Sequence, residues 1–450
     1  MGLSLCGNLL YNIKIKPKKI AAGRKGETMG KRVEIGPNVF FEGKQTTKFK
    51  TACFSLSLIR PLCREEAAMN ALLPSVLLRG TENYPDICSI SAFLDEMYGA
   101  SIGALVRKNG QIQTTGFYAS FLEDRFAAPD ARILESMVDF LRELLLEPKL
   151  EEGCFPQDFV EGEKLNLQNT IESALNDKRY YASQRMLELL CGDDGYGISR
   201  LGTVEEVGAI TPRTLFDHYQ KILRASQVEI FYCGSLDVER AADLFRRAFG
   251  TLGTTDPTPV CREPFHPGGP VRRAEEVMDV AQGKLAMGFS TDCRAGDPEF
   301  PALMVLNAVY GSGMTCKLFE TVREKLSLCY SISTVIHGAK GLMTLSSGID
   351  TKDLDRVQAE IRDQLEACCR GEISVDELDA AKQGILASLT TIGDSPSQME
   401  DYALYRTLSG QNMDIEAYEK AISAVTVEDA VRAAQKIRLE AVYFLRGPVR

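Results

Sequence analysis

The chain contains few residues that could bind a catalytic metal or activate a nucleophile. It has three histidines, His218, His266 and His337, and the nearest two are 48 positions apart. Metal-dependent hydrolases commonly bind zinc through two histidines one helical turn apart, and no such pair exists in this sequence. The thirteen cysteines are an odd number and include no Cys-x-x-Cys motif, which argues against a disulfide framework and a zinc ribbon. We therefore expect free thiols and a reducing compartment, the cytoplasm.

Other catalytic motifs are also absent from the sequence. There is no Gly-x-Ser-x-Gly elbow and no Walker loop, and Gly311-Ser312-Gly313 lacks the third glycine of a dinucleotide fingerprint. His218 lies between Phe216 and Tyr219, which favours a structural role. A Cys–His catalytic pair stays open, because its two members need to meet only in space.

The distribution of charge and hydropathy limits the partners. The formal net charge is −10, but residues 1–32 hold eight Lys or Arg and one Glu, so the rest of the chain is strongly acidic. An acidic body repels phosphate backbones, and we expect no nucleic-acid partner. No stretch approaches the roughly 20 apolar residues of a membrane span, so we expect no membrane segment. We interpret the basic leader as a disordered tail or as an over-extended gene start, with the true initiator at Met29.

Two halves of the chain show the same order of predicted elements. Alternating apolar residues predict a strand at residues 54–58 and again at 285–289, each followed by an apolar helix that ends near Gly80 or Gly311. Later pairs include helices at 133–146 and 354–365, strands at 112–119 and 342–349, and terminal strands at 228–233 and 441–445. Ser374 and Glu377 form a capping-box signature for a further helix, matched by residues 158–175.

This order predicts an α+β protein made by duplication of one domain. Residues 251–273 hold five prolines and no periodic apolar pattern, so they are interpreted as a linker. The predicted organisation is a basic leader at 1–32, a first domain at 33–250, the linker at 251–273 and a second domain at 274–450. Two like halves often bind a ligand between them.

Four local motifs, in this order and spacing, resemble the insulinase (pitrilysin-like) metallopeptidase family. They are residues 71–81 (ALLPSVLLRGT), 91–100 (SAFLDEMYGA), 199–206 (SRLGTVEE) and 311–330 (GSGMTCKLFETVREKLSLCY). The resemblance covers nearly everything after about residue 33. It implies two tandem homologous domains, each a mostly antiparallel sheet with helices packed on it.

The resemblance also implies a lost zinc site. Active members carry His-x-x-Glu-His on the helix that ends in Gly-Thr, with two zinc-binding imidazoles and a carboxylate that deprotonates the attacking water. Anchored on Gly80 and Thr81, those positions are Ala71, Pro74 and Ser75. The third ligand is a glutamate within residues 163–172 in the family, and an ungapped placement puts Thr170 there. We expect no metal and no other cofactor in this chain.

The motif in the second half is better preserved. Family members use an arginine and a tyrosine there to contact bound peptide opposite the zinc site, and these match Arg323 and Tyr330. A guanidinium fork binds a carbonyl or carboxylate, and a phenol can hydrogen-bond a polarised carbonyl. Alternatively, Arg323 forms an ion pair on the surface of a helix, and Tyr330 is a core residue at a strand edge.

These expectations define a function and its alternatives. The family includes two-chain enzymes in which one subunit holds the zinc motif and the other lacks it. This chain resembles the second kind, a non-catalytic subunit that binds an active zinc-bearing partner and helps to enclose a peptide or unfolded polypeptide. The first alternative is a purely structural scaffold, and the second is a self-sufficient metallopeptidase with replacement ligands.

Overall fold

The computed structural model describes residues 30–448, apart from residues 193, 255, 261 and 267. The strands of the first half are β1 (Val33–Gly36), β2 (Val39–Gln45), β3 (Thr51–Pro61), β4 (Ser101–Asn109), β5 (Ile112–Leu122) and β6 (Gln227–Gly234). Those of the second half are β7 (Arg272–Val277), β8 (Gly283–Ser290), β9 (Cys329–His337), β10 (Leu342–Ile349) and β11 (Arg438–Arg446).

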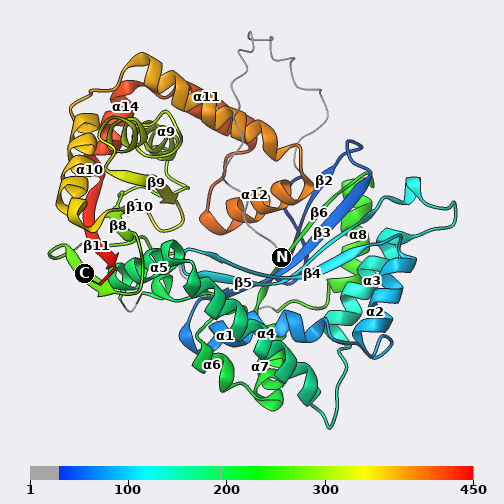
Figure 1. Cartoon of the computed structure of the whole chain (residues 1–450). Coiled ribbons are helices and arrows are strands. Elements are labelled where there is room, and N and C mark those ends of the chain that lie inside the picture. The colour runs from blue at the N-terminus through cyan, green and yellow to red at the C-terminus, as the bar shows by residue number, and fades with distance from the viewer. Residues whose placement is uncertain (1–29, 193, 255, 261, 267, 449–450) are drawn as a thin grey trace.

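These strands form one sheet in each half, and the two sheets are built alike (Figure 1). The first sheet has the order β1-β2-β6-β3-β5-β4 and the second the order β7-β11-β8-β10-β9. The β2–β6 and β7–β11 pairs are parallel, and the other neighbours are antiparallel. Apart from the additional edge strand β1, the strand order is the same, as a duplicated domain predicts. The predicted fold class is confirmed.

Helices cover both sheets. In the first half they are α1 (Arg64–Leu77), α2 (Ile87–Glu96), α3 (Ile133–Leu146), α4 (Gln157–Asn176), α5 (Lys178–Cys191), α6 (Val204–Gly208), α7 (Pro212–Ala225) and α8 (Val238–Phe249). In the second half they are α9 (Phe300–Tyr310), α10 (Leu354–Cys369), α11 (Val375–Ile392), α12 (Pro396–Ser409), α13 (Ile415–Ala424) and α14 (Val427–Lys436). A π-helical segment, η3 (Phe319–Lys325), precedes β9.

Local sequence signals account for several of these elements. The strand β3 alternates, with Phe54, Leu56 and Leu58 inside the core of the first half. The capping box of α11 forms as predicted: the Glu377 amide donates to Ser374 Oγ at 3.2 Å, and the Ser374 amide donates to the Glu377 carboxylate at 2.8 Å. Helix α3 spans the predicted residues 133–146. Among the helices of the described residues, none combines the length and hydropathy that crossing a bilayer requires.

The predicted leader and linker differ from the structure at their ends. Residues 1–29 of the leader lie outside the described residues, but Arg32 pairs with Glu229 of β6 at 2.9 Å, so the end of the leader is ordered. Strand β7 takes up the last two residues of the predicted linker. The linker contacts both halves, because the Thr258 amide donates to Ala225 O at 2.8 Å and Lys340 Nζ donates to Glu263 O at 3.2 Å.

Each half lends one helix to the sheet of the other half. Helix α5 packs on β8 and β11 of the second sheet, and α12 packs on β6 and β3 of the first (Figure 1). The core helices α1, α3, α7 and α8 lie on the opposite face of the first sheet, which we call its outer face. The face beneath α12 is called the inner face. This exchange ties the two halves together beyond the linker.

Candidate functional site

The three positions that match the family's zinc motif lie on α1, which packs on β4 and β5 at one edge of the first sheet. Ala71 and Pro74 are buried and Ser75 is half-buried. A methyl group and a proline ring have no lone pair for a metal, and a neutral hydroxyl is a weak substitute for imidazole or carboxylate. The residues present therefore do not fit a zinc ion.

Pro74 stands inside α1, yet the helix continues through it to Leu77. Proline has no amide hydrogen, so the carbonyl of Asn70, one turn earlier, loses its helical donor. Thr115 of β5 supplies a replacement, because its hydroxyl donates to Asn70 O at 2.6 Å. A side chain from the sheet thus replaces the hydrogen bond that the helix loses at Pro74.

The position matched to the third ligand lies on α4, which packs against α1. Thr170 is exposed, and its hydroxyl donates to Asn166 O of its own helix at 2.8 Å. Glu163, at one end of the predicted window, pairs with Arg79 at 3.2 Å, and Glu172, at the other end, is exposed. Neither Thr170 nor these glutamates joins a metal-binding group with α1. Within the part of the chain that the structure describes, no group of three or more His, Cys, Asp or Glu is arranged to hold a metal ion.

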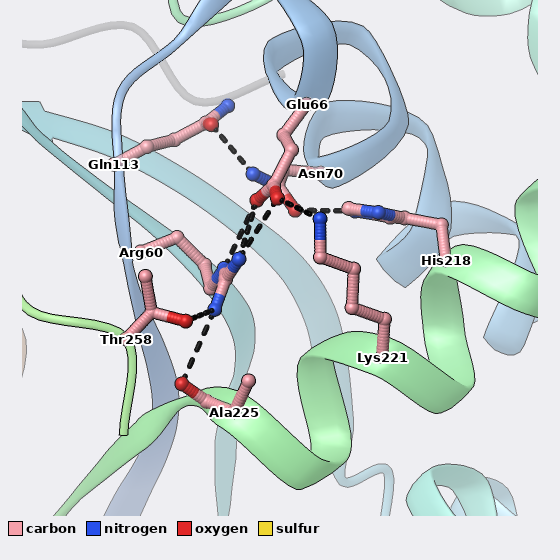
Figure 2. Close-up of polar contacts among 8 residues, drawn as sticks. All are labelled: Arg60, Glu66, Asn70, Gln113, His218, Lys221, Ala225 and Thr258. Atoms are coloured by element: carbon pink, nitrogen blue, oxygen red, sulfur yellow. Dashed lines mark hydrogen bonds and ion pairs between the residues drawn. The ribbon is translucent and has the colours of Figure 1, made fainter. Parts of the chain in front are cut away.

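A buried ion pair lies beneath the start of α1 (Figure 2). Arg60 of β3 is 1% exposed and donates to both carboxylate oxygens of Glu66, at 2.7 and 2.9 Å from Nη2. Its other terminal nitrogen, Nη1, donates to Thr258 Oγ1 at 2.9 Å and to Ala225 O at 3.2 Å. Lys221 of α7 also donates to Glu66, at 2.7 Å. Burial alone would raise the pKa of Glu66, but these hydrogen bonds from Lys221 and Arg60 outweigh it and lower the pKa.

A separate, neutral chain of hydrogen bonds lies beside this pair. His218 Nε2 lies 2.8 Å from Asn70 Oδ1, Asn70 Nδ2 donates to Gln113 Oε1 at 2.9 Å, and Gln113 Nε2 donates to Ala67 O at 3.0 Å (Figure 2). Burial lowers the pKa of His218 to about 4, so the ring is neutral at physiological pH and donates from Nε2. The network fixes α1 against β3, β5 and α7, and His218 has the structural role expected for it.

The two predicted peptide contacts lie together in the second half. Arg323 lies in η3, which packs along the edge strand β9, and Tyr330 lies at the start of β9. The side chain of Arg323 is 41% exposed, 4.6 Å from the centre of the Phe319 ring and 3.7 Å from Glu324. Burial raises the pKa of Cys329, and the charge of Arg323 partly opposes this rise, which places the guanidinium near the start of β9.

Tyr330 is the extra residue of a β-bulge. Cys329 pairs with Ile349 and Ser331 pairs with Gly348, so Tyr330 has no partner across the strand. Bulges redirect side chains at sheet edges, and Tyr330 is 65% exposed. Arg323 thus contacts a neighbouring glutamate, whereas Tyr330 lies outside the core. None of the polar contacts among the described residues joins Arg323 or Tyr330 to α1.

Sequence reasoning missed the network beneath α1. Arg60 lies near the end of a buried strand that holds no other charged residue, and Glu66 and Asn70 lie on one face of the following helix at helical spacing. A charged residue in an apolar strand was the available signal for a buried pair. The contributions of Gln113 and Lys221 have no such signal, because they come from distant parts of the chain.

Comparison with known proteins agrees with this architecture. A family model described as "Peptidase M16 inactive domain" matches residues 209–385. The "Probable inactive metalloprotease YmfF" of Bacillus subtilis (strain 168) is 31% identical over 409 residues, which cover 90% of this chain and 94% of that protein. The "Uncharacterized zinc protease YmxG" of the same bacterium is 22% identical over 370 residues, covering 79% of this chain and 87% of that protein.

A solved structure shows the same fold. The crystal structure of a conserved protein from Enterococcus faecalis V583 superimposes with a TM-score of 0.87 at 28% sequence identity, covering 93% of this chain and 99% of that chain. The high coverage extends the likeness to both halves of the chain. Together with the residues at positions 71, 74 and 75, these matches show that the chain belongs to the insulinase (peptidase M16) family and is an inactive homologue within it.

Proposed function

We propose that this chain is the non-catalytic subunit of an insulinase-family peptidase complex, in which it binds peptide and an active zinc-bearing partner. The observation that carries the proposal is the contrast between the two halves. The first half has hydrocarbon side chains at Ala71 and Pro74, where active members carry functional groups, whereas the second half keeps the arginine and the tyrosine. A chain that had lost all contact with peptide would have no need to keep Arg323 and Tyr330.

The position of these two residues supports contact with a peptide. Arg323 keeps donors available to a ligand, because its ion-pair contact with Glu324 is 3.7 Å long and its side chain is 41% exposed. A surface contact of this kind contributes little to stability and is readily exchanged for a ligand carbonyl or carboxylate. The hydroxyl of the exposed Tyr330 can donate to a peptide carbonyl at the same edge of the sheet.

A zinc-bearing partner supplies the chemistry that this chain lacks. Bacillus subtilis has both a relative named as inactive and one named as a zinc protease, so the two kinds of member occur in one cell, as pairing requires. We place the complex in the cytoplasm because the cysteines of the described residues are all free thiols, as a reducing compartment maintains. The acidic body argues against nucleic acid as a partner, and no membrane role is proposed.

The first test is the zinc content and peptidase activity of the purified chain alone. After dialysis against a trace chelator, elemental mass spectrometry should find far less than one zinc per chain, and the chain alone should not cleave unfolded polypeptide. An active family member purified in parallel serves as the positive control. Retained stoichiometric zinc would support the self-sufficient metallopeptidase with replacement ligands and contradict our proposal.

The second test uses the complex with the zinc-bearing family member from the same organism. Arg323→Ala and Tyr330→Phe should each lower kcat/KM of the complex for an unfolded peptide by about tenfold, because each removes a contact to the bound chain. The size of the complex, measured by light scattering, should not change.

Two matched control variants distinguish the loss of a peptide contact from a general effect of substitution on the complex. Lys325→Ala removes an exposed positive charge from the same helical segment, and Tyr180→Phe removes an exposed phenol from α5, so both should leave kcat/KM unchanged. Unchanged kinetics in Arg323→Ala and Tyr330→Phe would favour the purely structural scaffold. Failure of the two chains to associate would contradict the partner role itself.

A further inference from the structure

Three sulfur atoms meet where helix α12 covers the inner face of the first sheet. Cys53 of β3 and Cys233 of β6 lie directly opposite each other in an antiparallel pair, and both are 0% exposed. Met399 of α12 packs on them, and the Cys233 thiol donates to Met399 Sδ at 3.9 Å. The three residues are far apart in the sequence, so the folded sheet and the exchanged helix bring their sulfurs together (Figure 1).

Hydrogen bonds link these sulfurs into one chain. The Tyr118 hydroxyl donates to Cys53, the Cys53 thiol donates to Cys233, and Cys233 in turn donates to Met399. Thiols are weak donors and weak acceptors, so the chain contributes little energy as hydrogen bonding. What it shows is position, because the two thiols and the thioether are neighbours in the folded chain.

This set of donors suits a soft metal ion. Thiolate and thioether sulfur select Cu(I), zinc or iron–sulfur clusters over hard cations. Structural zinc takes four ligands, and iron–sulfur clusters are held by four cysteines. Across the described part of the chain, no group of three or more His, Cys, Asp or Glu is arranged around a metal site, so no further ligand of these types completes a tetrahedral set. Cu(I) is the soft ion that accepts a trigonal set of sulfurs.

The spacing of the sulfurs also suits a trigonal site. Sulfur binds such metal ions at about 2.3 Å, so three sulfurs around one ion lie about 4.0 Å from one another. The contact of 3.9 Å between Cys233 Sγ and Met399 Sδ has this length. Opposite residues of an antiparallel pair have Cα atoms about 4.5–5.5 Å apart, which lets both thiols reach one ion. We propose that Cys53, Cys233 and Met399 bind one Cu(I) ion between the two halves.

The charges around the sulfurs are compatible with this ion. Two thiolates and Cu(I) carry one net negative charge, and the buried Lys44 of β2 is the register partner of Cys233. A hydrogen bond from Cys53 lowers the pKa of Cys233 against the effect of burial, and the charge of Lys44 acts in the same direction. The same hydrogen bond and burial raise the pKa of Cys53, so this thiol releases its proton to water only as the metal replaces it. The nearby carboxylate of Glu400 is paired with Arg107, at 2.7 and 2.8 Å.

The site lies close to the surface and joins both halves. The half-buried side chains of Phe49, Tyr118 and Ile392 border the sulfurs, so one layer of side chains separates them from solvent. A bound ion connects β3 and β6 to α12 and stabilises the folded chain, because the unfolded chain does not hold the three sulfurs together. The sequence alone predicts no metal in this chain, since no local spacing marks these three residues. The proposal does not depend on peptide binding.

Competition for Cu(I) tests the site. The full-length chain is incubated without oxygen with the Cu(I) complex of bicinchoninate, and the loss of the absorbance of that complex measures transfer of the ion. The wild type should take up about one copper per chain and retain it through gel filtration, as measured by elemental mass spectrometry. X-ray absorption at the copper edge should show three sulfurs at about 2.3 Å and no nitrogen or oxygen ligand.

Substitutions of the three residues locate the ion. Cys53→Ala and Cys233→Ala should each lower the Cu(I) affinity by about 100-fold or more, because each removes an anionic ligand. Met399→Leu conserves side-chain volume and should lower the affinity by about tenfold, with two sulfurs left around the copper. Cys368→Ala and Met343→Leu change buried residues of the core of the second half, and as matched controls they should bind like the wild type. Circular dichroism of the metal-free variants checks their folding, and Met399→Leu decides alone if a cysteine variant does not fold.

Several outcomes would overturn the site. A wild type that takes no copper from bicinchoninate would show that the three sulfurs only pack against one another. Uptake that Cys53→Ala and Cys233→Ala leave unchanged would place the copper on other thiols. An unchanged X-ray absorption spectrum in Met399→Leu would exclude α12 from the site, and preferential retention of zinc would contradict the choice of metal.

Discussion

His218 lies in a buried site where a charged imidazole is unfavourable. Burial lowers its pKa to about 4, whereas an unperturbed histidine has a pKa of about 6.5. Between these values the unfolded chain binds more protons than the folded chain, so the free energy of unfolding falls as the pH drops from about 6.5 to about 4. The pKa of His337 is also lowered by burial, to about 4, and this residue acts in the same direction.

Replacing His218 should weaken this pH dependence. In His218→Gln the side chain cannot titrate but can still donate to Asn70 Oδ1. The difference in unfolding free energy between about pH 7 and about pH 5 should shrink by about 2 kcal/mol, because one of the two buried histidines no longer takes up a proton on unfolding. Urea unfolding followed by circular dichroism measures the free energy of unfolding at each pH. Between about pH 7 and about pH 8 the free energy of unfolding should change with pH in the same way in the variant and the wild type. If the difference in this free energy between about pH 7 and about pH 5 is the same in both proteins, the lowered pKa of His218 is contradicted.

At the residue scale, the sequence predicts the role of a single residue better than the side chains with which it forms hydrogen bonds. The structural role of His218 follows from its aromatic neighbours, and the degenerate positions on α1 follow from the Gly80-Thr81 anchor. The partners of Glu66 and Asn70 do not follow, because Lys221 reaches Glu66 from α7, and Gln113 and His218 reach Asn70 from β5 and α7. No local pattern specifies which distant side chains will meet.

Helix α1 shows how one element compensates for another. Pro74 removes the amide that would bond the carbonyl of Asn70, and Thr115 of β5 donates to that carbonyl instead, at 2.6 Å. Thr115→Val should therefore destabilise the protein by about 1–3 kcal/mol, since a buried carbonyl is left without a donor. In a Pro74→Ala background the restored amide can satisfy the same carbonyl, and the Thr115→Val substitution should cost about 1 kcal/mol less.

A double-mutant cycle in urea measures this coupling. Thr114 is the matched control, because it is the neighbouring buried threonine of β5 and its hydroxyl has no hydrogen-bond partner. Thr114→Val should show no coupling to Pro74→Ala. A cost of Thr115→Val that is the same in both backgrounds would mean that the hydroxyl does not replace the missing amide.

At the element scale, regular helices and strands with strong signals were predictable. The capping box fixes the start of α11, and the apolar periodicity fixes α3. The pattern did not indicate α5, α12, β4 or β9. Helix α12 buries the charged Glu400 beside Met399 and Ala403, so a charge interrupts its apolar face, and the edge strand β9 is irregular at Tyr330.

At the scale of the whole molecule, the repeated order of elements predicted two like halves, but it did not predict that they exchange helices. Sequence periodicity reports which face of a helix is buried and not which sheet buries it. The exchange implies that cutting the linker will not separate the halves. A protease site inserted between Gly268 and Gly269, which are exposed and have open space around them, should yield two fragments after cleavage.

These fragments should elute together in size-exclusion chromatography at the volume of the intact chain. The apolar contacts of α5 with the second sheet and of α12 with the first sheet should hold them together. Introducing a charge beneath α5 by Ala182→Asp should separate them after cleavage. Separation of the unmodified halves would contradict the account of the exchange.

Because the two halves exchange helices, the order of synthesis on the ribosome determines when each exchanged helix can be buried. The first sheet is complete once β6 has been made, but α12, which covers its inner face, is translated only after most of the second half. For helix α5 the order is reversed, because the helix is made before the sheet that buries its Met186 and Leu190. A nascent chain that ends after β6 therefore carries an uncovered sheet and an exposed apolar helix at the same time. Such a chain is a natural client for chaperones until β11, the last strand, has emerged.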